Sequence, residues 1–302
     1  MSNGLSAGAV AQINREFAEM VTSPDGRVKI AEKAHDVIYT RVHESSSWDK
    51  IIPPKNVTVE ECQISETTDS YYKLEEIAEE VDIAMVLDHL GQPTGSYLQG
   101  ERFTVPFFMI SSERFWKTIQ EIRAYKHPIT DFIERSASNE IIRRKDQYGV
   151  QLCEAALAAT GKVWNAPNFN DLVRDDFVRL FNLIDGDELI SKRVWMRQDD
   201  FNELLKWKSA DIDIKAGDTA FGGVQTATIL GREVVTTIKN VFPKGWIYCF
   251  TDPEFIGKAY TLEDMKFELE KRFNVIQFQS QLEYGCNLGN IFGISKLIIP
   301  QN

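Results

Sequence analysis

The chain has 302 residues, and its 43% hydrophobic and 11% aromatic content is ample for one large domain or two lobes. A formal net charge of −11 argues against sequence-specific reading of nucleic acid, which needs a concentrated basic face. No apolar run approaches the ~20 residues that cross a bilayer, so we expect no membrane segment. The N-terminus also lacks the charged and apolar regions of a signal peptide.

The first 55 residues are polar and broken up, with one helical stretch predicted over about 27–41. Val28, Ala31 and Ile38 share a face of that helix. A serine run at 45–47 and the prolines at 53–54 end the helix and extend the chain. This pattern predicts an arm that leads into a body, rather than a domain with its own core.

Residues 69–110 predict a long hairpin. The stretch "SYYKLEEIAEE" (70–80) forms the outgoing strand, and "ERFTVPFFMI" (101–110) forms the returning strand. The segment between them is rich in glycine and proline, which favour turns. The outgoing stretch also fits a helix, because Leu74, Ile77 and Val81 share a helical face. The returning stretch is apolar on both faces. Because an isolated hairpin is marginal in water, we expect it to lie against another surface, which another chain can supply.

The strongest helical pattern runs from about 136 to 160, where an apolar stripe from Ala137 to Ala159 opposes charged residues at 143–146. Serine and asparagine suit its start, and Gly161 suits its end. At 1.5 Å per residue, a helix of ~25 residues spans about 37 Å. We expect it to act as a strut.

Beyond Gly161, helices and strands intermix. Helices are predicted over 170–184, 199–207 and 262–273, and strands over 192–197, 274–286 and 292–300. The aromatic segment 229–260 also has the composition of strands. Because the spacing is not that of regular βαβ units, the pattern predicts an α+β fold.

Motifs of catalysis and ligand binding are absent from the sequence. The histidines (35, 43, 89 and 127) are scattered, and there is no G-x-S-x-G, P-loop or G-x-G-x-x-G motif. The acidic cluster at 185–188 lacks the spacing of a calcium loop, which favours a solvated turn. Trp195, Trp207 and Trp246 favour core positions over base stacking. The cysteines (62, 153, 249 and 286) show no C-x-x-C pair, which predicts free thiols. We therefore expect no catalytic, cofactor or metal site.

The order of these parts is arm, long hairpin, strut helix, α+β body and a closing strand. This order resembles the HK97-fold major capsid proteins of tailed bacteriophages. The most similar detail is "NVFPKGWIYCFTDPEFIGKAY" (240–260) followed by "LEYGCNLGNIFGISKLII" (282–299), which looks like that family's strand, glycine-containing turn and closing N-x-x-G-x-x-K-L strand. The resemblance covers nearly the whole chain from about Arg27.

The resemblance implies a division of the chain into the parts of that fold. Residues 1–55 would form the N-terminal arm, 56–112 the E-loop with the strands leading to and from it, and 113–160 the P-domain with its spine helix. Residues 161–265 would form the A-domain, and 266–302 the end of the A-domain and a return strand to the P-domain. The segment 229–260 would then be scaffolding strand in the core of the subunit.

The resemblance also implies a function: self-assembly as pentamers and hexamers into an icosahedral shell that encloses the phage genome. The expected partners are many copies of the chain, a separate scaffolding protein, a portal, a cement protein, and double-stranded DNA contacted without sequence specificity. The expected location is the virion, after assembly in the host cytoplasm. We expect noncovalent locking of the shell, and we expect six hairpin residues to contact other subunits: Tyr71, Tyr72, Lys73, Glu101, Arg102 and Phe103.

Two alternatives stay open. The first is an encapsulin-type bacterial compartment shell, which shares the fold; small shells that package one kind of protein would favour it over DNA-filled shells. The second is an enzyme whose active site is assembled from distant residues, which no local motif reveals. Size exclusion separates the second from both shells, since capsomers and shells run far above a single subunit.

Overall fold

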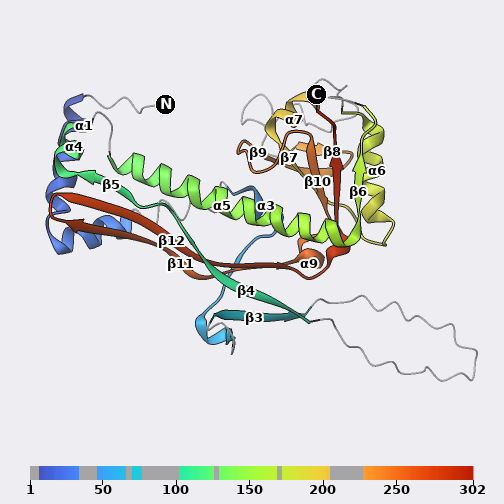
Figure 1. The fold of residues 1–302 in the computed structure, drawn as a ribbon, viewed down its shortest axis with the longest axis horizontal. Helices are drawn as coiled ribbons and strands as arrows, with labels where there is room; N and C mark the ends of the chain where they lie inside the picture. The colour runs from blue at the N-terminus through green and yellow to red at the C-terminus, as the bar shows by residue number, and fades with distance from the viewer. Residues whose placement is uncertain are drawn as a thin grey trace, which may run out of the picture.

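The computed structural model describes residues 7–33, 46–65, 70–76, 102–125, 129–168, 172–204 and 227–301. These residues form two β-sheets and a set of helices, with parallel and antiparallel strand pairs in both sheets. Figure 1 shows an elongated molecule, in which one long helix runs beside the first sheet and reaches the second sheet at one end. The mixture confirms the predicted α+β class.

The first sheet has seven strands in the order β1-β11-β12-β4-β3-β2, and β5 pairs with the far half of β12. Its centre is a long antiparallel hairpin made of β11 and β12, against which β4 and β5 pair in turn. The strands are β1 (Lys55–Asn56), β2 (Gln63–Ile64), β3 (Tyr71–Glu76), β4 (Arg102–Ser111), β5 (Phe115–Thr118), β11 (Gly257–Arg272) and β12 (Val275–Leu288).

Strand β11 corrects one prediction, because a helix was expected over 262–273. Along this stretch Phe267 is buried and Leu269 half-buried, while Glu268 and Glu270 are exposed. This alternation has the period of a strand. The strand pairs with β12 as far as Arg272 opposite Val275. The glutamates and lysines here favour a helix, but the partner strand directly across a two-residue turn overrides that preference.

The strut helix, α5 (Ile129–Thr160), has 32 residues and confirms the predicted helix while starting earlier. At 1.5 Å per residue it is about 48 Å long. It buries Ile141, Cys153 and Leu157 in the main core, which it shares with β12 and β4. The helix ends at Gly161, whose φ of 69° suits glycine, and the Gly161 N–H donates to the carbonyl oxygen of Leu157.

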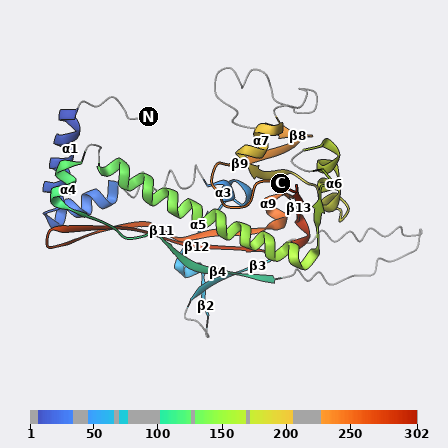
Figure 2. The ribbon, with the colours of Figure 1, turned by 45° about the horizontal axis from the view of Figure 1, so that its top comes forward.

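The second sheet has six strands in the order β6-β13-β10-β7-β9-β8. One face packs against α6 (Arg174–Asp185) and α7 (Gln198–Leu204) around a separate core, and the other face belongs to the main core. Figure 2 shows α6 and α7 on the side of this sheet away from α5. The strands are β6 (Val163–Asn165), β7 (Arg193–Arg197), β8 (Ala227–Ile229), β9 (Arg232–Thr237), β10 (Trp246–Phe250) and β13 (Ile294–Ile298).

The last strand differs from its expected course. We expected the chain to end on a strand that returns to the sheet beside the strut helix. Instead, residues 266–288 lie in that first sheet, and β13 ends the chain between β10 and β6 in the second sheet. Ile294 and Leu297 of β13 point to opposite faces and are both fully buried. A strand that is apolar on both faces fits a central position between two cores.

Short helices complete the fold. Helix α1 (Ala7–Met20) lies beside α4 (Ile119–Ala124) at the end of the β11–β12 hairpin, where Phe17 contacts Phe278 at 6.4 Å between ring centroids. Residues 24–33 are also helical, and the rest of the helix predicted over 27–41 lies outside the described residues. The remaining helices are α3 (Ser47–Ile51), η1 (Val59–Glu61), α9 (Pro253–Ile256) and η2 (Ile291–Gly293).

Candidate subunit-contact surface

The predicted hairpin is present at its base, where β3 and β4 pair from Tyr72 opposite Pro106 to Glu76 opposite Arg102. The outgoing stretch is therefore a strand over 71–76, which decides between the strand and helix readings there. Residues 77–101, including the predicted contact residue Glu101, lie outside the described residues. Figure 1 shows β3 and β4 at the lower edge of the molecule, beyond β11 and β12.

One face of this hairpin base packs on its own chain. Val105 is fully buried in a small core with Val57 and Tyr260, and Tyr71 and Phe103 pack against it. On the same face, the Lys73 ammonium lies 4.6 Å from the centre of the Tyr260 ring and forms ion pairs with Glu61 at 3.4 Å and Glu75 at 3.5 Å. Burial and a hydrogen bond to Glu75 raise the pKa of Tyr260, so its hydroxyl stays protonated. The side chains of this inner face therefore have their packing and ion-pair partners within the same subunit.

The opposite face has no such cover among the described residues. Because strand side chains alternate, the register places on it three residues of β3 and three of β4. We call this set the outer face: Tyr72, Leu74, Glu76, Arg102, Thr104 and Pro106. Leu74 is 41% exposed, and Arg102 lies 3.8 Å from Glu76 with both side chains in solvent.

The five predicted contact residues that the structure describes thus fall on two different faces. Tyr72 and Arg102 lie on the outer face, whereas Tyr71, Lys73 and Phe103 point toward the subunit's own core. Four further residues complete the outer face and were not predicted from the sequence as contact residues: Leu74, Glu76, Thr104 and Pro106. The signal that identifies them is the two-residue period, which applies only once the outgoing stretch is known to be a strand.

A buried polar joint holds the second sheet to the strut helix. Asp146 of α5 accepts hydrogen bonds from Ser46 Oγ (3.1 Å), Ser47 Oγ (2.8 Å) and the Trp48 N–H (3.0 Å) at the start of α3. The neighbouring Lys145 is fully buried and pairs with Asp49 at 2.5 Å. Burial raises the pKa of Asp146, partly opposed by these three donors.

Trp48 fills the centre of this α3–α5 joint. Its ring is fully buried against Trp195 at 5.8 Å and Phe250 at 6.2 Å between ring centroids, both on the second sheet. On α5, a Cβ added to Gly149 would lie 2.3 Å from an atom of the Trp48 ring. Glycine at this position lets the indole lie directly on the helix backbone.

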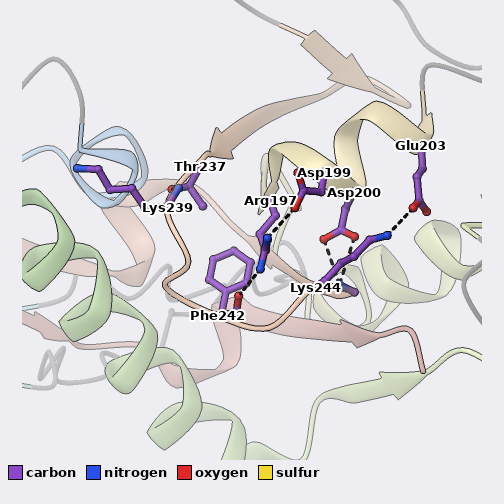
Figure 3. Close-up of polar contacts among 9 residues, drawn as sticks. Arg197, Asp199, Asp200, Glu203, Thr237, Lys239, Phe242 and Lys244 are labelled. Carbon is purple, nitrogen blue, oxygen red and sulfur yellow. Dashed lines mark hydrogen bonds and ion pairs between the residues drawn. The ribbon is translucent and has the colours of Figure 1, made fainter. Parts of the chain in front are cut away.

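A second polar cluster fastens the segment between β9 and β10 onto α7, as Figure 3 shows. Asp200 accepts from the Gly245 N–H through both oxygens, at 3.2 and 3.1 Å, and burial raises the pKa of Asp200. Lys244 donates to Glu203 at 2.7 Å, which raises the pKa of Lys244. Arg197 pairs with Asp199 at 2.6 Å. Each carboxylate here has a cation or N–H partner, so the cluster fastens the chain without offering a free acid–base pair.

The acidic cluster and the tryptophans that the sequence analysis considered as possible sites have structural roles where the structure describes them. At the turn after α6, Asp185 accepts from the Ser191 N–H and pairs with Arg232 at 3.3 Å, and Asp187 pairs with Lys162. Trp195 is a core residue, whereas Trp246 lies under the Lys296 ammonium and Trp207 lies outside the described residues. All four histidines also lie outside them.

The thiols have no disulfide partner among the described residues, as expected. Three of them are buried, and burial raises the pKa of Cys153 and Cys249 and raises that of Cys286 to about 12. Within the described ranges, no three His, Cys, Asp or Glu side chains gather as a metal site would require. No described helix has both the length and the hydropathy that crossing a membrane requires.

Comparison with known proteins finds likeness in structure but none in sequence. No protein-family model matches the chain, and no curated protein matches it. A virus-like particle from Pyrococcus furiosus matches 88% of this chain and 98% of its own, with a TM-score of 0.55 and 12% identity. A structure of Microbacterium phage Oxtober96 matches 85% and 91%, with a TM-score of 0.57 and 13% identity.

A third match is the capsid of an empty GTA particle, which covers 84% of this chain and 90% of its own, with a TM-score of 0.51 and 14% identity. In each case the chain spans nearly the whole length of the matched protein. The chain has the HK97-like capsid fold.

Proposed function

We propose that this chain is the major capsid protein of a tailed bacteriophage, which assembles as pentamers and hexamers into an icosahedral shell around double-stranded DNA. The observation that carries the proposal is the match to particle and capsid structures over at least 84% of the chain. The uncovered outer face of the hairpin gives it independent support, since a subunit in a shell has such a surface to bury.

In this proposal the parts of the chain keep the roles that the resemblance implies: an arm over 1–55, the E-loop over 56–112, and the P-domain with α5 over 113–160. The A-domain then takes the second sheet, with residues 257–288 belonging to the P-domain. Each outer face buries a modest area on a neighbour, but a closed shell repeats the contact many times and gains avidity from the repetition.

The proposed function is tested by the size of the purified protein. We expect size exclusion with light scattering to find capsomers or shells, and negative-stain microscopy to show particles. A separate scaffolding protein and a portal are the proposed helpers, with a cement protein on the finished shell. A protein that stays a 34.5 kDa monomer at high concentration, with or without these helpers, would contradict the proposal.

At residue level, we expect Arg102→Glu to prevent assembly while leaving the subunit folded. The change places a carboxylate directly opposite Glu76 on the outer face, and like charges directly opposite repel. Within the subunit the cost is small, because exposed ion pairs contribute about 0–1 kcal/mol. Circular dichroism checks the fold, and light scattering checks assembly.

The matched control is the charge swap Glu76→Arg with Arg102→Glu. It restores the cross-strand pair inside the subunit but exchanges the two charges on the outer face. If the face contacts a neighbour, the swap assembles no better than Arg102→Glu alone. Full recovery by the swap would mean that the pair serves only the hairpin, and the outer face would lose its role.

The compartment shell is the second candidate, because the virus-like particle from Pyrococcus furiosus is among the matches. The contents of purified particles separate the two. We expect nuclease-protected double-stranded DNA inside the particles, whereas a single packaged protein without DNA would favour the compartment.

A further inference from the structure

A groove of about 960 Å³ lies between the second sheet and the start of β11. That volume is in the range of sites that bind ligands. One wall comes from the first sheet and contains Lys55 of β1 and Lys258 of β11. The other wall comes from the second sheet and its connections, and contains Ile190 and Leu230. None of these four residues belongs to the outer face, to the α3–α5 joint or to the cluster on α7.

The first-sheet wall is cationic. Strands β1 and β11 pair with Lys55 opposite Tyr260, so Lys258, two residues earlier in β11, lies on the same face of the sheet as Lys55. Neither lysine forms an ion pair with any residue that the structure describes. Two ammonium groups on adjacent strands without counter-ions repel each other, and an anion bound between them would relieve that repulsion.

The second-sheet wall offers apolar contact. Ile190 is 70% exposed, and the half-buried Leu230 lies in the same lining. The three cations on this wall each have a carboxylate partner already: Lys192 with Asp252, Arg193 with Glu233 at 3.0 Å, and Arg232 with Asp185 at 3.3 Å. What this wall leaves open to a ligand is therefore its apolar surface.

The groove has a net positive charge. Glu254 of α9, which is exposed, is the one lining carboxylate outside those three pairs, and it stands against the two unpaired lysines. The whole chain has a formal net charge of −11, so the groove is a local exception to its acidic character. A concave site of one sign of charge concentrates ligands of the opposite sign. The groove therefore favours an anionic ligand.

We propose that this groove binds an extended segment of a partner protein in which acidic and apolar side chains alternate. In an extended chain, successive side chains point to opposite sides. Such a segment places its carboxylates against Lys55 and Lys258 while its apolar side chains contact Ile190 and Leu230. A ligand that is charged on both sides, or apolar on both sides, would leave one of the two walls unmatched.

Two other occupants fit the groove less well. Single-stranded nucleic acid also has its charge on one side, but proteins hold it by stacking aromatic side chains on its bases, and none of the described residues that line the groove is aromatic. The outer face of the hairpin from a second copy has Glu76 as its carboxylate, and Glu76 already lies 3.8 Å from Arg102. The proposed occupant is therefore a different protein, which adds a partner to the proposed function without depending on it.

A labelled peptide of alternating aspartate and leucine tests the groove, with fluorescence anisotropy of the purified chain as the measurement. We expect saturable binding that weakens as salt is raised, because salt screens the contacts with the lysines. Lys258→Glu places a carboxylate against the aspartates, and we expect it to lower the affinity at least about tenfold. Ile190→Ser should weaken binding as well, because an apolar contact is lost, while the stability of the subunit should change little at so exposed a position.

The matched control is Lys29→Glu, which makes the same change of charge at another exposed lysine. Lys29 lies in the helical stretch 24–33, at the end of the molecule away from the second sheet (Figure 1). This variant should bind the peptide as the wild-type protein does. Circular dichroism confirms that each variant is folded.

The proposal is overturned if the wild-type protein shows no saturable binding, or if Lys258→Glu and Lys29→Glu weaken binding equally. A peptide of alternating lysine and leucine that binds equally well would also overturn it, because the lysines of the groove would then play no part. If a single-stranded oligonucleotide displaces the peptide and binds more tightly, the occupant is nucleic acid and the assignment to a protein is wrong. None of these results bears on assembly, so the groove and the proposed function are tested separately.

Discussion

Asp146 is a single carboxylate that organises the start of α3. It lies on α5 with 1% exposure and accepts from two serine hydroxyls and one backbone N–H. The charges that face it are Lys239, from the segment after β9, and the Lys145–Asp49 pair beside it. Because burial outweighs these partners, the pKa of Asp146 in the folded state lies above its ordinary value of 3.8.

This raised pKa predicts a pH dependence of stability. The folded state binds the proton more readily than the unfolded state, so the contribution of Asp146 to stability is full below about pH 3.8 and is lost as pH rises through the raised pKa. We expect Asp146→Asn to lower the free energy of unfolding by about 1–3 kcal/mol at neutral pH. One carboxylate oxygen, which accepts hydrogen bonds, is replaced by an amide NH₂ group, which donates and would face other donors.

The stability advantage of the wild-type protein over Asp146→Asn should grow as pH falls from 7 toward 4. Urea unfolding of both proteins at several pH values measures the difference. An advantage that shrinks on acidification would show that the carboxylate is stabilised rather than penalised by its site. The same residue could not have been identified from the sequence, where Arg143, Arg144, Lys145 and Asp146 form one run of charged residues in a predicted helix. Two of these four are buried, because α3 covers that side.

At the scale of elements, the β11–β12 hairpin ends in a strained and exposed turn. Phe273 is 99% exposed with a φ of 51°, a conformation that L-residues other than asparagine and aspartate rarely adopt. It buries nothing within the subunit. The turn is therefore not optimised for the stability of the isolated chain.

We expect Phe273→Gly to stabilise the subunit by about 1 kcal/mol, because glycine relieves the left-handed strain and no buried contact is lost. The neighbour Asn274 has a negative φ, so Asn274→Gly should instead destabilise by about 0.5–1 kcal/mol. Chemical unfolding of both variants measures the pair. A loss of stability in Phe273→Gly would mean that the ring has contacts in the free subunit.

Prediction of elements from sequence succeeded where local signals agree. The strut helix has an apolar stripe and a terminal glycine, and the structure contains it. The serines and asparagine at 136–139, which suggested its start, lie inside the helix, because it begins at Ile129. The β3 strand and β11 were harder, because Glu75, Glu76, Glu268 and Glu270 favour helices. Both stretches become strands because each pairs with a partner strand: β3 with β4, and β11 with β12 across a two-residue turn. Propensity is local, whereas pairing is decided by which strand lies alongside.

For the whole molecule, the decisive feature is the α3–α5 joint, because Trp48 is the side chain through which α3 connects the strut helix to the second sheet. We expect Gly149→Ala to cost about 3 kcal/mol, since the new methyl group would overlap the Trp48 ring. Gly8→Ala in α1 is the matched control: a Cβ there meets nothing within 4 Å, so the change should be neutral or slightly stabilising.

A smaller side chain at position 48 tests whether this overlap is the cause. Trp48→Leu destabilises by itself but should partly compensate Gly149→Ala, so the double variant should be more stable than the sum of the two changes predicts. Thermal unfolding of the four proteins measures the coupling. Strict additivity would mean that the two residues do not meet.

The overall architecture was within reach of the sequence through the order of its parts, since arm, hairpin, strut helix and α+β body all have composition signals. The sheet that the final strand joins could not be predicted from the sequence. An apolar strand such as 294–298 fits either sheet equally well, and only the packing of β10 and β6 on both sides decides its place. The outer face was also out of reach until the outgoing stretch was known to be a strand, because it is assembled from β3 and β4, which are separated in the chain.

The fully enclosed indole of Trp48 has a consequence for the proposed shell, in which pentamers and hexamers place the same subunit at different angles. Tilting one lobe against the other would open a gap around the ring, so each protomer should behave there as a stiff unit. In that shell, differences in curvature between pentamers and hexamers would then be taken up at the seams between protomers.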